Sequence, residues 1–451
     1  MTAIQQKRKP AALSLPDNTS AGLPGAGNAW LDQLRADATA QYQSSGLPTV
    51  RDEEWRYTDL RAFKRQQYAI ANSVPDVSDV IAALPDYDLP RVVLVNGYFA
   101  PACSRLDNLP TGISVDSLAI TLQQNPESLK GLLGTALPAE THAFTQLNSA
   151  YCNDGAVIRI ASKATVEKPI ELIHVTTEHD EPVVSHPRNI IIADKLSQVT
   201  IIERSVCADN KPDSTSYLLN TVTEIIAHDG AQVQHYKVQQ DADNAFHMGG
   251  VFANQGRDSN VVNHNITLGS KLARNDIHLN LLGTNAHGGM NGLVVGHEKQ
   301  HVHNHTEVQH KVPHCTSDEY YRSVLDDKSR AVFRGRIVVA EDAQKTDAQQ
   351  QNNNLLLSAD AEADSKPQLE IYADDVLCSH GATVGQLDPK SLFYLQSRGI
   401  NLKDAQRLLT FAFVNEVLER ITFEPLQLEL MERFLGELLS ESYKHYYQEL
   451  L

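Results

Sequence analysis

Cys378 and His380 are the pair of residues whose types and spacing most directly suggest chemistry. They lie two positions apart, and alternate residues of a β-strand point to the same side of a sheet. If the strand that begins at Leu369 runs this far, both side chains share one face. A thiolate and an imidazole together suit zinc or iron–sulfur chemistry. The alternative is a small buried thiol beside a histidine with a purely structural role.

Two ligands do not complete such a site. An iron–sulfur cluster takes about four protein ligands. If Cys378 and His380 bind a metal, we therefore expect the missing ligands to come from another chain. The pair would then mark an assembly surface rather than a finished cofactor pocket.

A second group of candidate ligands is His301, His303 and His305, followed by His310 and His314. On a strand the first three share a face, but the outer two lie about 13 Å apart. Zinc–nitrogen bonds are about 2.0–2.1 Å long, so one ion cannot be held by both. A His-x-His pair would need further ligands from elsewhere. We interpret the group as a polar strand face whose imidazoles take hydrogen bonds, and expect no metal at His301 and His303.

Sequence motifs of the common ATPases and serine hydrolases are absent. There is no Gly-x-x-x-x-Gly-Lys-Ser/Thr and no Gly-x-Ser-x-Gly. Paired acids such as Asp326-Asp327 are more typical of turns than of catalytic sites. We therefore expect a chain that is not an enzyme. The alternative function is an autonomous β-helix enzyme or a histidine-rich metal-binding protein.

Composition excludes several classes of partner. The chain has 451 residues and a formal net charge of −17, without a long basic run, so we expect no nucleic acid as partner. It has no stretch of eighteen apolar residues, so we expect no membrane span. The five cysteines are widely spaced, with no Cys-x-x-Cys, which is typical of a reducing compartment and excludes a resident ferredoxin-type cluster. We expect a cytoplasmic protein.

The elements that must position Cys378 and His380 fall into a central β region and two helical ones. From about residue 155 to 375, short runs alternate apolar and polar residues between turn residues, as in 261–268 and 333–339. We expect an all-β domain, and a solenoid rather than a sandwich, because few hairpin turns separate the runs. The amide tract 349–354, which precedes Leu355–Leu357, is either aggregation-prone or a stack of amides at a turn before a buried strand.

Helix signals flank this region. Towards the N-terminus, Trp30, Leu34, Ala38 and Tyr42 predict a helix that stops at Gly46. A strand at 91–95 precedes an Asn-Gly turn, and residues 113–150 look mainly helical.

Towards the C-terminus, Asp388 and Pro389 predict a helix start and Arg398-Gly399 its stop. Asn401 would cap a helix over 402–421, and a last helix follows Pro425. The apolar stripes of these two helices pack either within the chain or on a partner.

These patterns divide the chain into four parts. We expect a disordered extension at 1–26, a mainly helical N-terminal region at 27–150, a β-solenoid core at 151–385 and a C-terminal helical domain at 386–451.

Several segments in order resemble the SufB/SufD family of iron–sulfur cluster assembly proteins, over roughly residues 27–451. They are Gly46–Leu60, Asn96–Tyr98, Phe144–Asn148, Ala343–Ala348 with Asn352–Ser358, and Leu369–Gly399. The stretch Cys378–Thr383 is similar to the SufD branch of the family. The resemblance implies a mainly β fold, with a right-handed parallel β-helix flanked by N-terminal and C-terminal helical regions.

The resemblance also implies a role and partners. A chain of this kind is a non-catalytic scaffold subunit of the SufBCD complex. It pairs with SufB through the β-helix and binds the ATPase SufC through the C-terminal helices, and a homodimer is plausible in isolation. His380 would be a transient, shared ligand of a nascent iron–sulfur cluster at the SufB interface, with Cys378 nearby. No permanently bound cofactor is expected from this chain alone.

Overall fold

The computed structural model describes residues 22–139, 141–208 and 215–438. Most of the predicted disordered extension, residues 1–21, lies outside this part of the chain, as does the end of the predicted C-terminal helical domain, residues 439–451. Residues 22–26 form turns, in which Leu23 is buried and the Pro24 carbonyl accepts a hydrogen bond from Arg35 Nη2 at 2.8 Å.

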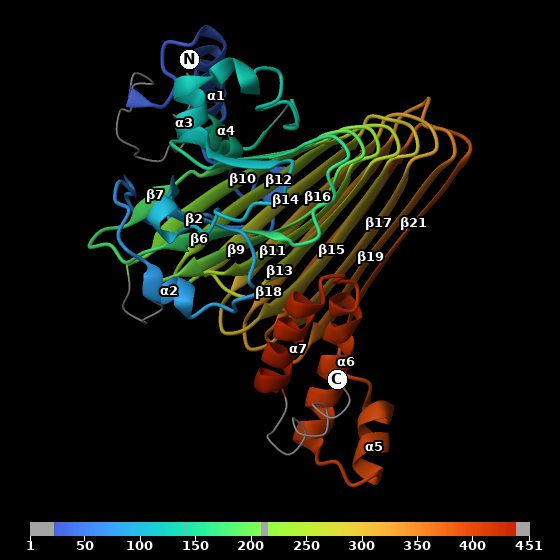
Figure 1. The fold of residues 1–451 in the computed structure, drawn as a ribbon. Coiled ribbons are helices and arrows are strands. Elements are labelled where there is room, and N and C mark those ends of the chain that lie inside the picture. Colours follow the sequence, from blue (N-terminus) through green and yellow to red (C-terminus); the bar gives the residue numbers. More distant parts are fainter. Residues whose placement is uncertain (1–21, 140, 209–214, 439–451) are drawn as a thin grey trace, which may run out of the picture.

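Two sheets of parallel strands form the centre of the molecule, and each coil of the chain adds one strand to each sheet (Figure 1). Sheet A contains β4 (Ile113–Ser117), β5 (Ala156–Ile160), β8 (Arg188–Ala193), β10 (Tyr217–Ala227), β12 (Phe246–Gln255), β14 (Leu272–Leu281), β16 (His301–His310), β18 (Arg330–Val339) and β20 (Glu362–Ile371), with β1 (Ala69–Ile70) and β7 (Val183–Ser185) beside this row. Sheet B contains β2 (Arg91–Val95), β3 (Tyr98–Phe99), β6 (Ile170–Thr176), β9 (Gln198–Cys207), β11 (Gln232–Gln240), β13 (Asn260–Thr267), β15 (His287–Gly296), β17 (Thr316–Leu325), β19 (Thr346–Leu356) and β21 (Val376–Gly385). The predicted β-helix is confirmed.

Tight turns connect the strands of successive coils. Many of these turns contain one non-glycine residue with a positive φ, a conformation that reverses the chain within few residues. They are Lys163, Leu196, Asp258, Asn285, Glu298, His314, Asp327 and Lys345. Because turns of similar shape recur, each strand is brought into register with the strand one coil earlier.

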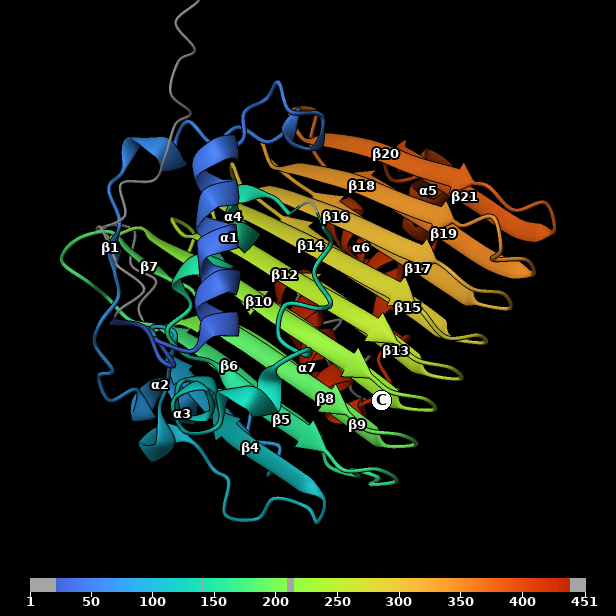
Figure 2. The same ribbon diagram turned by 90° about the horizontal axis from the view of Figure 1, so that it is seen from above.

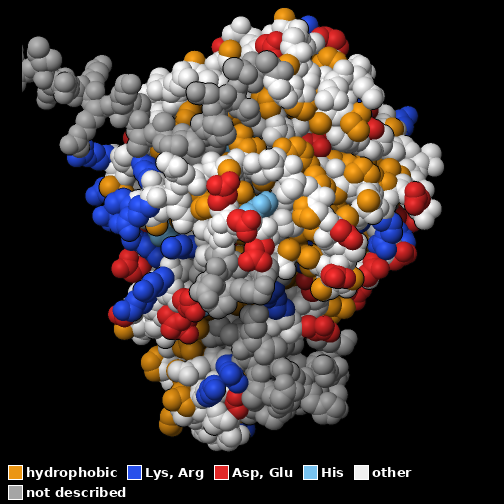
Figure 3. Space-filling model, turned by 90° about the vertical axis from the view of Figure 1, so that its left-hand side faces the viewer, with side chains coloured by type: hydrophobic (Ala, Val, Ile, Leu, Met, Phe, Trp, Pro, Cys, Tyr) orange, Lys and Arg blue, Asp and Glu red, His pale blue; other side chains and the backbone are white. Residues whose placement is uncertain are grey.

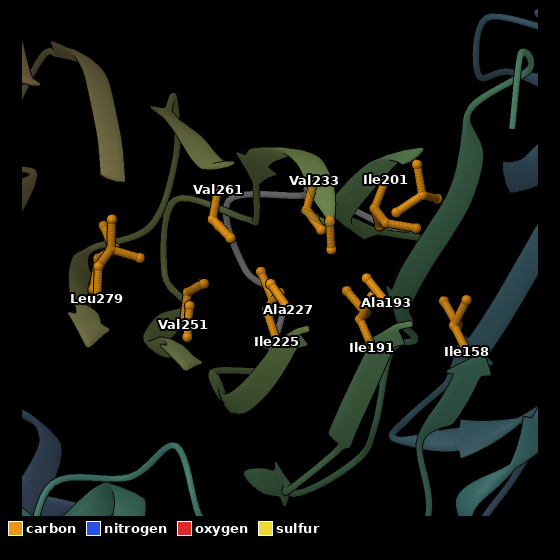
Figure 4. Close-up of a cluster of buried hydrophobic side chains, with 14 of the residues drawn as sticks. Ile158, Ile191, Ala193, Ile201, Ile225, Ala227, Val233, Val251, Val261 and Leu279 are labelled. Atoms are coloured by element: carbon orange, nitrogen blue, oxygen red, sulfur yellow. The ribbon is translucent and has the colours of Figure 1, made fainter. Parts of the chain in front are cut away.

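The interior between the sheets is filled by every second side chain of each strand. Figure 4 shows two facing rows, one from each sheet. Sheet B contributes Ile201, Val233 and Val261, and sheet A contributes Ile191, Ile225, Val251 and Leu279, all almost completely buried. Burying each such side chain is worth roughly 1.5–3 kcal/mol, so this row is a major source of the stability of the β-helix.

The amide tract 349–354 lies within strand β19, not at a turn as one interpretation of the sequence expected. Its side chains alternate: Gln349 and Gln351 are exposed, whereas Gln350 and Asn352 are buried. The pairing of this strand on both sides, with β17 and β21, explains why a polar tract adopts a regular strand here.

The N-terminal region forms a layer on the outer side of sheet A. In Figure 2 helices α1 (Ala29–Ser45) and α4 (Ala143–Tyr151) lie across this sheet above β10 and β12. The predicted helix that stops at Gly46 is confirmed, and Asn96 and Gly97 form the tight turn between β2 and β3 with φ of 51° and 89°. The predicted helical stretch 113–150 begins instead with strand β4, which pairs with β5.

The remaining elements of this layer are short. They are α2 (Ser78–Ala82), α3 (Leu118–Gln124), η2 (Glu53–Trp55), η3 (Phe63–Arg65), η4 (Pro101–Cys103) and η5 (Pro126–Leu129).

Helices α6 (Leu402–Leu418) and α7 (Glu424–Leu438) cover the outer side of sheet B, and α5 (Pro389–Ser397) lies farther out (Figure 1). The apolar faces of α6 and α7 pack within the chain, where Phe411, Val414 and Leu430 contact sheet B residues such as Tyr236 and Leu293. Intramolecular packing therefore explains the predicted stripes. Leu439, part of the predicted stripe of the last helix, lies outside the described residues. Helix α6 ends three residues before the predicted Ile421, and α7 begins one residue before Pro425.

Basic and acidic side chains are interspersed on the face of the molecule shown in Figure 3. None of the helices in the described ranges is long and apolar enough to cross a membrane.

Candidate functional site

The C-terminal end of the β-helix carries the predicted site. Strands β20 and β21 are the last of their sheets, so each pairs on one side only. In the part of the chain that the structure describes, no further strand covers their outer edges. The opposite end differs, because antiparallel partners, β4 in sheet A and β3 in sheet B, close it. Two strands of ten residues each therefore expose backbone N–H and C=O groups side by side.

Cys378 and His380 both lie on β21 and face the interior side of the sheet. The expected strand from Leu369 does not run this far, because β20 ends at Ile371 and a turn precedes β21, but the pair still shares one face. Cys378 pairs with Ala348 of β19, and His380 pairs with Gln350 of β19. Ala348 and Gln350 are buried in the interior, and paired residues of neighbouring strands project to the same side. Because β21 is the last strand, this interior side opens to solvent and His380 is exposed.

The two candidate ligands differ in environment. Cys378 is half-buried against Ala348 and Ile337, and burial raises the pKa of its thiol. A raised pKa lowers the fraction of thiolate, the form that binds metals and attacks electrophiles. His380 is the more accessible of the two, so it is the better candidate for a ligand that another chain completes.

Apolar side chains surround this end of the molecule. Tyr372 is 63% exposed and Leu377 71% exposed, and Ile371 and Val384 are also exposed. The open strand edges and these side chains form one surface, here called the open end, which comprises β20, β21 and Tyr372.

Helix α5 follows the open end directly. Asp388 caps it, accepting hydrogen bonds from the backbone N–H groups of Lys390 and Ser391 at 3.3 and 3.1 Å, as the sequence predicts. Two aromatic side chains of α5 project outward, Phe393 at 72% and Tyr394 at 57% exposure. A groove of about 470 Å³, lined by residues that include Leu357, Leu387, Leu392 and Arg407, separates α5 and α6 from the last turns of the β-helix.

His301, His303 and His305 of β16 face the N-terminal layer on the outer side of sheet A, whereas His310 points inward, its Nε2 2.9 Å from Ser317 Oγ of β17. Thr58 Oγ1 lies 3.1 Å from His301 Nε2 and 2.8 Å from His303 Nδ1. Burial lowers the pKa of His301 to about 4 and that of His303 well below its usual value, so both are neutral at pH 7. Their contacts are hydrogen bonds that hold the layer to the sheet.

Asp276, which sequence reasoning missed, lies beside this histidine row. Asp276, His278 and His305 are the only group of three potential metal ligands found among the described residues. Oxygen Oδ1 of Asp276 accepts from Arg274 Nη2 at 2.7 Å and from His305 Nδ1 at 2.9 Å. Oxygen Oδ2 accepts from Arg274 Nε at 2.9 Å and from His142 Nε2 at 2.8 Å.

Those four bonds use the acceptor capacity of the Asp276 carboxylate. Burial alone would raise its pKa, but Arg274 and His142 hold the pKa well below its usual range. A carboxylate so occupied, next to a fixed guanidinium, is a poor ligand for a divalent cation. The group is a structural clamp between β14, β16 and the N-terminal layer. In the sequence, the only sign of this group was that polar residues occupy the alternate positions 274, 276 and 278. That pattern did not reveal that Asp276 contacts His142 and His305.

His297 and His301 also match the His-Glu-x-x-His pattern of zinc proteases, a match that sequence reasoning overlooked. That pattern works on a helix, where both histidines share one face. Here His297 and Glu298 lie in a turn, with Glu298 at φ 51°, and His301 begins β16. The match therefore lacks the geometry that the zinc site requires.

Comparison with known proteins agrees with this architecture. The model of the SufBD core domain, described as SUF system FeS cluster assembly, matches residues 174–413, and that of the SufBD protein N-terminal region matches residues 15–172. An iron–sulfur cluster assembly SufBD family protein of Synechocystis is 34% identical over 84% of this chain and 85% of its own. Iron–sulfur cluster assembly protein SufD of Escherichia coli is 31% identical, over 92% of this chain and 97% of the Escherichia coli protein. The protein of the same name from Bacillus subtilis is 26% identical, over 89% of this chain and 93% of the Bacillus subtilis protein.

Proposed function

The chain belongs to the SufBD family of iron–sulfur cluster assembly proteins, and from this we propose that it is a non-catalytic, cytoplasmic scaffold subunit of SufD type. In this proposal it pairs with a SufB-type subunit, binds a SufC-type ATPase and shares a nascent cluster with the first of these partners. The single observation that carries the proposal is the open end, where two unpaired strand edges lie beside His380.

The open end is suited to pairing with another β-rich subunit. Unpaired strand edges gain main-chain hydrogen bonds when a partner strand is added. The exposed side chains of Tyr372 and Leu377 supply the apolar contact that such an interface needs. A SufB-type subunit docked here would cover His380, so that ligands from both chains could meet at the interface.

The ligand count supports a shared site. His380 and Cys378 provide two ligands, and the only group of three potential ligands found among the described residues lies elsewhere, at Asp276. Since a cluster takes about four ligands, a partner would contribute the remainder. The cluster is then the cargo of the complex rather than a resident cofactor of this chain.

Helix α5 supports the ATPase contact. Phe393 and Tyr394 are large, exposed and rigid, the kind of side chain that dominates the binding energy of interfaces. The helix is separated from the open end by only three residues, 386–388. Movement of a bound ATPase could therefore be transmitted to β21 and His380 over a short path.

The test is co-expression of the chain with SufB-type and SufC-type subunits, followed by purification and an ATP-dependent cluster assembly assay. We expect a three-component complex, and we expect His380→Ala to lower cluster yield while the complex stays intact. Cys378→Ala is the matched variant on the same strand and should have the smaller effect.

Three outcomes would contradict parts of the proposal. A chain that purifies without either partner would remove its main premise. Stoichiometric metal, or an activity, in the isolated chain would instead favour an autonomous metal-binding protein or enzyme. Loss of the complex on His380→Ala would show that this residue is structural.

A further inference from the structure

His380 stands at the end of a row of residues that runs into the β-helix. Its pairing partner on β19 is Gln350, and the partner of Gln350 on β17 is Glu319. Glu319 pairs in turn with Met290 of β15. Adjacent strands are about 4.8 Å apart, so these side chains form a ladder along the interior. Two polar residues thus lie directly beneath the exposed histidine, and the apolar Met290 follows them.

The side-chain amide of Gln350 has a defined orientation. Its Nε2 donates a hydrogen bond to Glu319 Oε2 at 3.0 Å, and Thr306 Oγ1, from the opposite sheet, donates to the same oxygen at 2.8 Å. Because the amide nitrogen faces Glu319, the amide oxygen Oε1 is directed elsewhere. Gln350 is 3% exposed, and its Oε1 is a buried acceptor with no hydrogen-bond partner among the residues that the structure describes.

The backbone of sheet A leaves room for this amide at Gly335. A Cβ atom on Gly335 would lie 2.2 Å from Gln350 Nε2, far closer than any non-bonded contact allows. Gly335 pairs with Thr306, the second donor to Glu319. Glu319, itself held by Thr306, and the backbone at Gly335 therefore fix the Gln350 amide, and His380 is the residue paired with Gln350 on the strand to the other side.

A buried, unpaired carbonyl oxygen beside an exposed imidazole has a clear chemical use. Histidines that bind metals almost always donate their other ring N–H to a carbonyl or carboxylate, which fixes the tautomer and the ring orientation. Leaving a buried acceptor unpaired is costly, which favours a donor from the nearest side chain.

We propose that Gln350 is a positioning residue for His380: its Oε1, unpaired in the structure, accepts a hydrogen bond from one ring nitrogen when the exposed imidazole turns towards it, so that the other nitrogen carries the free lone pair. The nitrogen with the lone pair is then the one available to the cluster. Glu319 acts through Gln350 by holding the amide in the required orientation. The identity of the ligand rests on the proposed function, whereas the hydrogen bond itself does not.

The tautomer of His380 tests the hydrogen bond directly in the isolated full-length chain. The chain is labelled with ¹⁵N-histidine, and the His380 signals are identified by their loss in His380→Asn. The test variant is Gln350→Met, which keeps length and volume but removes the acceptor. Gln351→Met, the exposed neighbour on the same strand, is the matched control. Gly335→Ala is a second test variant, which displaces the amide without altering Gln350.

We expect Gln350→Met and Gly335→Ala to shift the His380 tautomer ratio about fivefold towards that of free histidine, the effect of one net hydrogen bond. Gln351→Met should leave the ratio unchanged. Equal ratios in the wild type, both test variants and the control would overturn the proposal, provided that circular dichroism shows each variant to be folded.

A separate assay distinguishes this proposal from the proposed function. In the reconstituted complex, Gln350→Met should lower cluster yield about fivefold, in line with the tautomer shift. A tautomer shift without any effect of His380→Ala on cluster yield would leave the hydrogen bond established and refute the ligand role.

Discussion

Arg204 of β9 and Glu429 of α7 form a two-pronged ion pair across 225 residues of sequence, with both nitrogen–oxygen distances at 2.8 Å. Arg204 is almost completely buried, and Tyr87 also donates a hydrogen bond to Glu429. Although burial disfavours its charge, the carboxylate raises the pKa of Arg204. The pair therefore joins the C-terminal helices to sheet B.

Glu429→Ala should destabilise the chain by about 3 kcal/mol, because it leaves a buried guanidinium without its partner. The free energy of unfolding is measured by urea titration. Glu432→Ala, an exposed position on the same helix, is the control and should change stability by less than about 0.5 kcal/mol. Equal effects of the two variants would contradict a role for the pair.

Asp276→Asn should destabilise the contact between the N-terminal layer and sheet A by about 3 kcal/mol, since Arg274 would lose its buried counter-charge. Thermal unfolding measures this, with Asp107→Asn at an exposed position as control. A zinc titration of the wild-type chain tests the assignment as a clamp. Stoichiometric zinc that is lost in His305→Phe would instead identify a metal site.

Glu319 should make stability depend on pH. Burial raises the pKa of Glu319 from 4.5 to about 7. Between pH 4.5 and 7 the folded state therefore holds a proton that the unfolded state has released. The contribution of Glu319 is full below pH 4.5 and is lost as pH rises through 7. The stability of the wild type relative to Glu319→Gln should therefore fall by about 3 kcal/mol between pH 4.5 and 8. Unfolding titrations over this range measure it, and the exposed Glu341→Gln should show no such slope.

Leu377→Glu should weaken pairing with a SufB-type subunit at least tenfold, because it puts a charge into the apolar part of the open end. Leu377 is exposed in the isolated chain, so the stability of that chain should hardly change. Binding is measured by calorimetry or by co-purification. Leu282→Glu, at an exposed turn of the β-helix, is the control, and pairing that tolerates both changes would place the interface elsewhere.

Replacing Phe393 and Tyr394 of α5 by Ser should weaken binding of a SufC-type ATPase by about 2 kcal/mol or more, which is the usual effect of removing dominant aromatic contacts. Pairing at the open end should be unaffected. Pull-down assays with each partner separately measure both effects. Gln396→Ser on the same helix is the control, and retention of the ATPase by the double variant would exclude α5 as its dock.

Local signals predicted local structure well. Gly46 ends α1 with φ 65°, Asn96 and Gly97 form the turn after β2, and Asp388 with Pro389 starts α5. Each depends on the conformational preference of one or two residues, which distant contacts did not override. The boundaries of α6 and α7 were less accurate, because their apolar faces continue beyond the helical residues and pack on sheet B.

The partners of the site residues could not be predicted in this way. Gln350 and His380 are 30 residues apart, and their pairing depends on the lengths and shapes of the two turns that flank β20. A change of one residue in either turn would exchange the interior and exterior faces of β21. The same holds for Asp276 and His142, which meet only because the N-terminal layer packs on sheet A.

The sequence by itself determined that the chain forms short strands, that Cys378 and His380 share one face of one strand, and that they cannot complete a cluster alone. Alternation and ligand number depend only on residue order, so they are readable from it. Only the tertiary structure decided that this face is the open interior of the β-helix and that Gln350 and Glu319 lie beneath His380. Likewise, only the fold showed that the His301–His305 row lies under the N-terminal layer. These facts depend on the register of successive coils and on packing between distant segments, which no local pattern specifies.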